Sequence, residues 1–188
     1  MLGSRERAAY GPACLWLLFS TSCGSTTAGA PGVAPPNTRE EPVAVTGEDA
    51  DAKGPFETCY STFSPSGDAS GDLARLVRNC GPAGGMRALT AVHQGQQGER
   101  DPVERLSFEV PEGGKCYRVY AVGDSGVKDL DLLLRGASGD AFVADVSHDS
   151  WPVLPPREPI CLSEAGVYLL EVSVSRGEGR YALQVWGR

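Results

Sequence analysis

Apolar and polar residues alternate with a period of two along most of the second half of the chain. The apolar positions of these runs are Leu106, Phe108 and Val110; Tyr117, Val119 and Ala121; Leu130, Leu132 and Leu134; Tyr168, Leu170, Val172 and Val174; and Tyr181, Leu183 and Val185. Such alternation is typical of strands that bury one face. Turn residues separate the runs at intervals of about 8–12 residues, which predicts an all-β sandwich or barrel.

One stretch before these strands has a helical period instead. Four apolar residues at i, i+3, i+4 and i+7 fall on one helical face: Leu73, Leu76, Val77 and Cys80. Asp72 and Arg78 suit the positive and negative ends of such a helix. Gly81 and Pro82 predict its end, the glycine as a left-handed cap and the proline as a breaker. After this short N-terminal helix, the polar and glycine-bearing stretch 94–105 predicts a loop.

The first residues have the pattern of an export signal. Arg5 and Arg7 precede the apolar run 13–19, which falls below the ~18 residues that a membrane-spanning helix needs. A basic start, a short apolar run and small residues after it predict a cleaved secretory signal.

Two cleavage sites fit this signal, and each gives a different mature protein. Ser20-Thr21-Ser22-Cys23 resembles the lipobox of bacterial lipoproteins, which implies a signal peptide over 1–22 and a diacylglyceryl group on Cys23. Gly24, directly after the cysteine, implies sorting to the outer membrane by the same resemblance. The alternative is ordinary cleavage after Ala28-Gly29-Ala30, which would remove Cys23.

The next segment has the composition of a tether. Residues 24–54 are rich in Gly, Ala, Thr, Pro, Asp and Glu and contain no aromatic residue, so they cannot bury enough surface to offset the entropy of ordering. We therefore expect a disordered tether over 23–54, a helix-containing extension over 55–100 and a β-sandwich over 101–188.

The charge of the chain limits its partners. The sequence holds 17 Lys and Arg residues against 24 Asp and Glu residues, a formal net charge of -7. Nucleic-acid binding needs clustered basic residues, and so does attraction to an anionic membrane surface. We expect no nucleic-acid partner and a membrane attachment through the N-terminal lipid. An envelope protein or a glycan would then be the partner of an exported domain that faces the periplasm or the cell surface.

The strand sequences form an ordered set of motifs within residues 101–188. Phe108 and Val110 precede a turn, and 117–122 reads Tyr-Arg-Val-Tyr-Ala-Val. Residues 129–134 read Asp-Leu-Asp-Leu-Leu-Leu with Gly139 in the following turn, and 166–172 and 179–185 both read Gly-x-Tyr-x-Leu-x-Val. This order resembles the bacterial pre-peptidase C-terminal (PPC) domain family. The resemblance implies a jelly-roll-like antiparallel β-sandwich without catalytic activity, of the kind appended to secreted proteases and other surface proteins.

Four cysteines remain beyond Cys14 and Cys23: Cys59, Cys80, Cys116 and Cys161. An even number in an exported protein predicts two disulfides, and four cysteines allow three connectivities. We favour Cys59–Cys80, which would join the helix end to the segment before it, and Cys116–Cys161, which would join two positions ahead of β-patterned runs. A four-cysteine zinc site is the rival, and the absence of a Cys-x-x-Cys pair speaks against it.

No group of residues has the pattern of a catalytic site. His148-Asp149-Ser150 holds the three residue types of a hydrolase triad, but adjacent residues do not face one another in triad geometry and no Gly-x-Ser-x-Gly elbow is present. His93 lies beside a polar loop, as a solvated histidine would. Gly113-Gly114-Lys115 lacks the remaining residues of a phosphate-binding loop. We therefore expect no enzyme activity and no cofactor.

Two kinds of binding residue stay open. Asp124, Asp129 and Asp131 are weak candidates for calcium, which prefers six to eight oxygen ligands; the alternative is a polar face and a capped turn. Trp151, Trp186 and Tyr120 are candidates for stacking on sugar rings; the alternative is that Trp186 and Tyr120 pack beneath segment 56–92. The sequence thus predicts a non-catalytic interaction or structural module of the cell envelope, with a carbohydrate- or polymer-binding module as the alternative.

Overall fold

The structure is a computed structural model that describes residues 54–98, 103–136 and 138–188. These residues belong to a compact unit, Glu40–Arg188. The predicted signal peptide over 1–22, the lipidation site Cys23 and nearly all of the predicted tether lie outside the described residues. Within the described ranges, no helix is long and apolar enough to cross a membrane.

Ten strands and three short helices make up the described part of the chain. The helices are α1 (Pro55–Tyr60), α2 (Ala69–Cys80) and the 3-10 helix η1 (Ala83–Gly85). The strands are β1 (Arg87–Ala88), β2 (His93–Gln97), β3 (Val103–Val110), β4 (Lys115–Gly123), β5 (Val127–Arg135), β6 (Ala141–Ala144), β7 (Val153–Leu154), β8 (Ile160–Leu162), β9 (Gly166–Gly177) and β10 (Gly179–Gly187).

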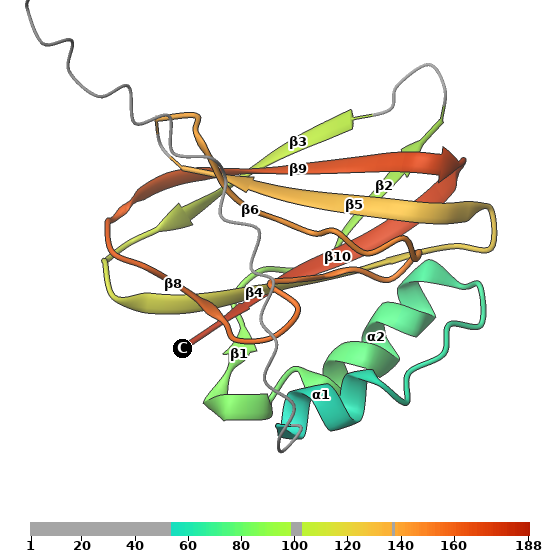
Figure 1. Ribbon diagram of the computed structural model, residues 1–188, viewed down its shortest axis with the longest axis horizontal. Coiled ribbons are helices and arrows are strands. Elements are labelled where there is room, and N and C mark those ends of the chain that lie inside the picture. The colour runs from blue at the N-terminus through green and yellow to red at the C-terminus, as the bar shows by residue number, and fades with distance from the viewer. Residues whose placement is uncertain (1–53, 99–102, 137) are drawn as a thin grey trace, which may run out of the picture. The chain divides into compact units, whose positions relative to one another are not determined.

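The strands form two antiparallel sheets that face each other (Figure 1). The first has the order β1-β10-β4-β7, with β2 also pairing with β10 and β8 with β4. The second has the order β3-β9-β5-β6. The predicted mainly β fold, an antiparallel β-sandwich, is confirmed.

The core between the sheets is built from the alternating apolar residues that the sequence pattern identified. Leu106 of β3 pairs with Leu170 of β9, and Leu132 of β5 pairs with Val172 of β9, so these side chains share one face of the second sheet. Residues of β4 and β10, among them Val119, face them from the first sheet. Burial of this apolar surface is the main stabilising contribution to the sandwich.

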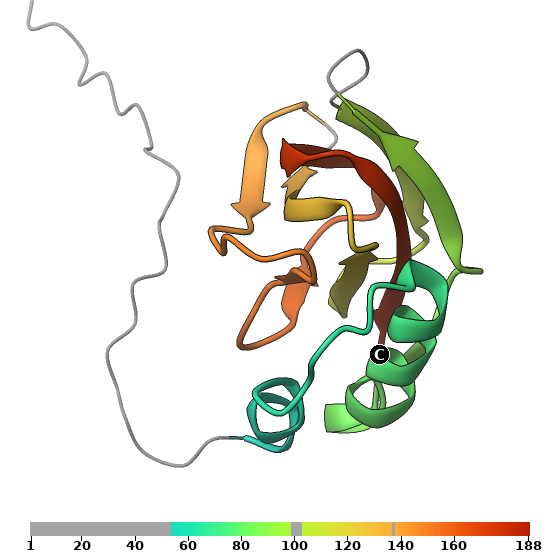
Figure 2. The ribbon, with the colours of Figure 1, turned by 90° about the vertical axis from the view of Figure 1, so that its right-hand side faces the viewer.

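A second core lies on the outer face of the first sheet, which α1 and α2 cover (Figures 1 and 2). Leu73 and Leu76 of α2 have no exposed surface, and they pack in one cluster with Tyr120 of β4 and Ala182 of β10. The four residues predicted to form the apolar face of the helix are all buried. The segment before residue 101 therefore supplies one cover of the sandwich as well as two of its strands.

The sequence analysis identified one helix, whereas the structure has α1 before α2. A helix of six residues is too short to show a helical period, and its stability comes from contacts. The amide of Gly54 donates to the Glu57 carboxylate at 3.0 Å. The Phe56 ring is buried, and the guanidinium of Arg118 lies 3.6 Å from the ring centroid.

Two further expectations need correction. The stretch 94–105 was predicted to be a loop, but β2 pairs with β10; an edge strand needs little apolar sequence because its backbone makes the sheet contacts. At Gly95 a Cβ atom would come within 2.4 Å of the Tyr181 ring, so glycine is required there. Gly81 has a right-handed φ of -58° and is not a left-handed cap. A Cβ on Gly81 would lie 2.7 Å from the Trp186 ring, so close packing explains this glycine.

Both predicted disulfides are present. Cys59 and Cys80, with Cα atoms 5.6 Å apart, join α1 to the last residue of α2. Cys116 of β4 and Cys161 of β8 are direct neighbours across an antiparallel pair, with a Cα separation of 3.8 Å. All four thiols are consumed in these bonds, so they do not form the alternative zinc site.

Candidate functional site

The segment 145–152 crosses from one sheet to the other along an edge of the sandwich. The amide of Asp145 donates to the carbonyl of Leu132, and the amide of Leu130 donates to the carbonyl of Asp149, which ties the segment to β5. The amide of Gly123 then donates to the carbonyl of Ser150 at 2.6 Å, which ties it to β4. These bonds hold the loop before β7 against both sheets.

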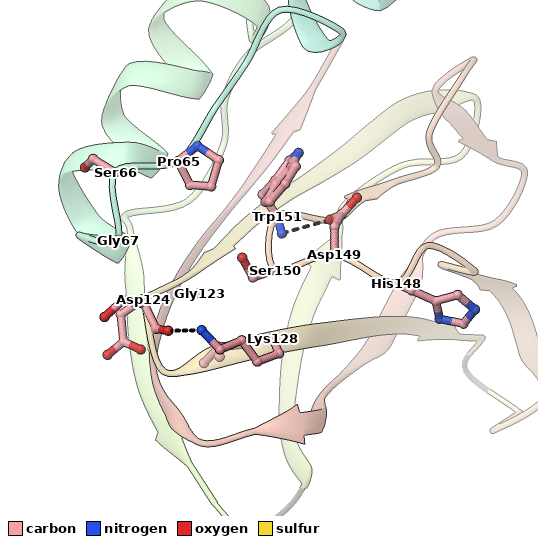
Figure 3. A pocket seen from close by; sticks show the side chains of 12 residues that line it. Pro65, Ser66, Gly67, Gly123, Asp124, Lys128, His148, Asp149, Ser150 and Trp151 are labelled. Carbon is pink, nitrogen blue, oxygen red and sulfur yellow. Dashed lines mark hydrogen bonds between the residues drawn. The ribbon is translucent and has the colours of Figure 1, made fainter.

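A pocket of about 400 Å³ opens beside this crossing segment (Figure 3). Three separate parts of the chain line it: residues 65–67 before α2, residues 123–128 around the β4–β5 turn, and residues 148–151. In Figure 3 the Trp151 indole stands between Pro65 and Asp149, and Lys128 and Asp124 lie across from it. We refer to this hollow as the Trp151 pocket.

The wall at 65–67 is positioned by a buried carboxylate of α2. Asp72 accepts hydrogen bonds from the amides of Ser66 at 2.6 Å and Gly67 at 2.9 Å, and its other oxygen pairs with Arg75 at 2.6 Å. Burial alone would raise the pKa of Asp72, but the bonds from Ser66 and Gly67 and the charge of Arg75 hold it below its usual value. The carboxylate therefore stays ionised and keeps the wall in place.

The opposite wall is a turn that Asp124 closes. Its carboxylate accepts hydrogen bonds from the amides of Gly126 and Arg180, each at 2.9 Å. The ammonium of Lys128 donates to the carbonyl of Ser125 at 2.6 Å. The carboxylate of Asp124 thus caps the β4–β5 turn, in keeping with the capping alternative considered for this residue.

Trp151 is held at its backbone and is half-buried at its side chain. Its amide donates to the Asp149 carboxylate at 2.9 Å, and its carbonyl accepts a hydrogen bond from the Tyr60 hydroxyl at 2.9 Å. Burial and the nearby Asp149 and Asp145 raise the pKa of Tyr60, so its hydroxyl keeps the proton that it donates. The indole packs against the second core, which limits the entropy that it could lose on binding.

Two carboxyl groups of the crossing segment and two of β5 influence one another. We call Asp129, Asp131, Asp145 and Asp149 the aspartate cluster. Burial is the largest cause that raises the pKa of Asp131, Asp145 and Asp149, and the negative charge of another cluster member adds to it in each case. Of these four residues, Asp149 also lines the Trp151 pocket.

The calcium candidates do not meet as a set. Asp129 lies in the aspartate cluster with Asp131, whereas the Asp124 carboxylate is occupied at the turn. Across residues 54–98, 103–136 and 138–188, no group of three or more His, Cys, Asp or Glu side chains is arranged to hold a metal ion.

The histidines have structural contacts. His148 is highly exposed, and its Nδ1 lies 3.6 Å from the Asp129 carboxylate. In Figure 3 its ring points away from Ser150, and in the described part of the chain Ser150 makes no hydrogen bond with it. His93 lies 3.0 Å from the Glu104 carboxylate, between β2 and β3.

The three aromatic candidates are separated by the fold. Trp151 lines the pocket. Tyr120 has no exposed surface, and Trp186 is half-buried with its ring 6.1 Å from the Tyr120 ring. Both of these belong to the core beneath α1 and α2, the alternative that the sequence left open. Sequence reasoning did not single out Lys128, Ser66 or Asp145, since no motif marks them and only the fold brings them to this corner.

Comparison with known proteins adds a likeness in fold. No family model and no curated protein sequence matches the chain. A crystal structure of the pre-peptidase C-terminal domain of a collagenase from Bacillus anthracis aligns with 52% of this chain and 89% of that domain, at 17% sequence identity and a TM-score of 0.42.

Proposed function

We propose that the protein is a non-catalytic binding module of the bacterial cell envelope, anchored by a lipid on Cys23, that binds its partner in the Trp151 pocket. One observation carries the proposal: three loops from distant parts of the sequence form a hollow of about 400 Å³ around a half-buried tryptophan. Ligand sites commonly combine an aromatic surface with a few polar groups in this way. Two disulfides fit an exported domain.

A carbohydrate or another hydroxyl-rich polymer is the second candidate, and the lining of the pocket favours it. The indole of Trp151 offers an apolar ring for a sugar face. The Asp149 carboxylate and the hydroxyls of Ser125 and Ser150 line the same hollow and suit hydroxyl ligands.

Catalysis is the weaker explanation for this pocket. A nucleophilic site needs a base within hydrogen-bond reach of the nucleophile. His148 points away from Ser150 (Figure 3), and the Asp149 carboxylate is bonded to the amide of Trp151. Binding by a preformed surface therefore accounts best for the arrangement.

The proposal is tested by replacing Trp151. The purified mature chain is applied to an array of envelope glycans, and the lipidated protein is crosslinked in native envelopes. Trp151→Ala should weaken binding by about 1 kcal/mol or more, roughly fivefold, as loss of an ordinary hot spot does. His148→Ala, in the same loop and with a highly exposed ring that points away from Ser150, should change binding little.

Further results test whether the Trp151 ring provides the binding surface and whether the protein is non-catalytic. Trp151→Phe keeps an aromatic ring and should keep most of the binding, which separates loss of the surface from loss of folding. Equal binding by the wild type and by a folded Trp151→Ala variant would place the partner elsewhere. Hydrolytic turnover that His148→Ala abolishes would show that the non-catalytic assignment is wrong.

A further inference from the structure

Among the residues that the structure describes, the edge of the second sheet at β3 is long and has no strand beyond it. Within the same residues β3, with eight residues, pairs with β9 alone, whereas β6 at the other edge has four. An uncovered edge presents unpaired backbone N–H and C=O groups, and proteins commonly protect such edges with proline, lysine or a bulge. β3 contains no proline, lysine or glycine, and its pairing with β9 has no register shift.

An apolar pocket of about 170 Å³ lies directly beside this edge. Leu106 and Phe108 of β3 form one side, and Leu183 and Val185 of β10 form the other. An apolar cavity on the order of 150 Å³ can hold a benzene molecule, so this one is large enough for a single aliphatic or aromatic side chain. Ala91, which is exposed, also lines this pocket.

The segment that supplies Thr90 and Ala91 to the pocket also exposes two large apolar residues. Leu89 is 45% exposed and Val92 is 44% exposed, and both belong to the segment that carries Ala91 between β1 and β2. Exposed large apolar residues grouped at a cavity are characteristic of interaction sites.

The two ends of β3 differ in the contacts that their glutamates make. At residue 104, the Glu104 carboxylate contacts His93 and accepts a hydrogen bond from Tyr181, which closes the gap between the sheets. At the other end, Glu109 is exposed on the outer face of β3, and within the described residues it has no ion-pair partner. The free stretch is therefore 106–110, with apolar residues facing the pocket and one unpaired negative charge facing outward.

We infer that residues 106–110 of β3 bind an extended segment of a partner polypeptide as an added strand. Main-chain bonds to β3 hold such a strand, and its alternate side chains provide specificity. An apolar side chain enters the pocket between Leu106 and Val185. A basic side chain on the other face of the added strand lies opposite Glu109, where unlike charges across a sheet attract.

The test uses the purified mature protein and two peptides of equal composition. The first, acetyl-Ser-Val-Thr-Leu-Lys-Val-Thr-Ser-amide, alternates apolar and polar residues; the second, acetyl-Ser-Leu-Val-Val-Lys-Thr-Thr-Ser-amide, does not. NMR titration should show saturable shifts of the backbone amides of residues 106–110 with the first peptide. The second peptide should bind at least tenfold more weakly.

Variants identify the contacts. Ala91→Phe enlarges an exposed side chain that lines the pocket and should weaken binding at least tenfold, whereas the matched Ala74→Phe, on the exposed face of α2, should leave it unchanged. Glu109→Lys reverses the charge outside the pocket and should weaken binding severalfold. Trp151→Ala should have no effect, which keeps this site distinct from the proposed function.

Three results would overturn the inference. One is unchanged binding by Ala91→Phe and Glu109→Lys, both shown to be folded by their thermal unfolding. Another is a set of amide shifts that lies outside residues 106–110. The third is a protein that without peptide is already dimeric through this edge, because the strand partner would then be a second copy of the chain.

Discussion

Single carboxyl groups in this protein are perturbed in opposite directions. Asp145 is 9% exposed, and burial followed by the charges of Asp149 and Asp131 raises its pKa. Glu171 of β9 has a lowered pKa because it accepts hydrogen bonds from Arg135 of β5 and Arg105 of β3. The native state therefore favours the neutral form of the first group and the charged form of the second.

These shifts predict opposite effects on stability. A raised carboxyl pKa means that the native state holds its proton more tightly than the unfolded chain, so stability falls as pH rises through the native pKa. Asp145→Asn should thus raise the free energy of unfolding at pH 7, on the order of 1 kcal/mol. The pKa of Glu171 is lowered, so its ionised form stabilises the native state at pH values above the ordinary pKa of a glutamate. This contribution is lost as the pH falls through the native pKa. Glu171→Gln should therefore destabilise the protein at pH 7. Chemical denaturation of both variants at pH 4 and pH 7 measures the effects.

The two variants serve as controls for each other, since each replaces an acid with its amide. Because the pKa of Asp145 is raised, more of the wild-type carboxyl is protonated at pH 4 than at pH 7, so the gain from Asp145→Asn should be smaller at pH 4. Shifts of the same sign in both variants at pH 7 would contradict this account of the two groups.

Among the elements, the two disulfides tie together parts of different kinds. In the chain-entropy model, closing loops with sequence separations of 21 and 45 residues contributes roughly 3–4 kcal/mol each. Replacing Cys116 and Cys161 by Ser should therefore destabilise the protein more than replacing Cys59 and Cys80, because the longer loop restricts the unfolded chain more. Urea unfolding of the two double variants gives the comparison.

Peptide mapping without reduction must accompany that comparison. A Cys80–Cys116 peptide, or free thiols at these positions in exported protein, would show that the pairing is wrong. A larger loss of stability from the Cys59–Cys80 pair would mean that native contacts of α1 outweigh loop entropy.

The elements that the sequence revealed are those that bury a face. β5 and β9 carry apolar residues at every second position because those residues meet in the core, and α2 shows its period because one side packs on β4. β2 and α1 left no such signal. The sequence of β2, His-Gln-Gly-Gln-Gln, is polar because the strand lies at an edge, and its pairing with β10 rests on backbone bonds.

For the whole molecule, the site was harder to foresee than the fold. Trp151 was identifiable as a rare aromatic residue among prolines, but its pocket is assembled from loops that lack any period. Ser66 reaches the pocket because the buried Asp72 holds its loop, and Lys128 reaches it through a turn. The tertiary packing that places α2 and β5 near one another brings these residues together. No motif or spacing in the sequence predicts that they lie close.

The attachment of the molecule is open to a direct test. Cells that express the protein are labelled with a palmitate analogue, and wild type is compared with Cys23→Ser. We expect label on the wild type and none on the variant, because only the thiol of Cys23 can receive the diacylglyceryl group in the lipobox interpretation. Equal labelling of the two proteins would contradict lipidation at Cys23, and a mature N-terminus at Pro31 would support ordinary cleavage after Ala30.

The Cys59–Cys80 bond determines how the domain would respond to mechanical pulling. Tension along the N-terminal segment reaches the described fold at Gly54, one residue before α1. Without a crosslink, a helix of six residues would unravel first. The disulfide transfers the load covalently from Cys59 to the end of α2, a helix that packs broadly on β4 and β10. Residues 60–79 are thereby shielded from the applied force, so the wall of the Trp151 pocket at 65–67 can keep its shape while the N-terminal segment is under tension.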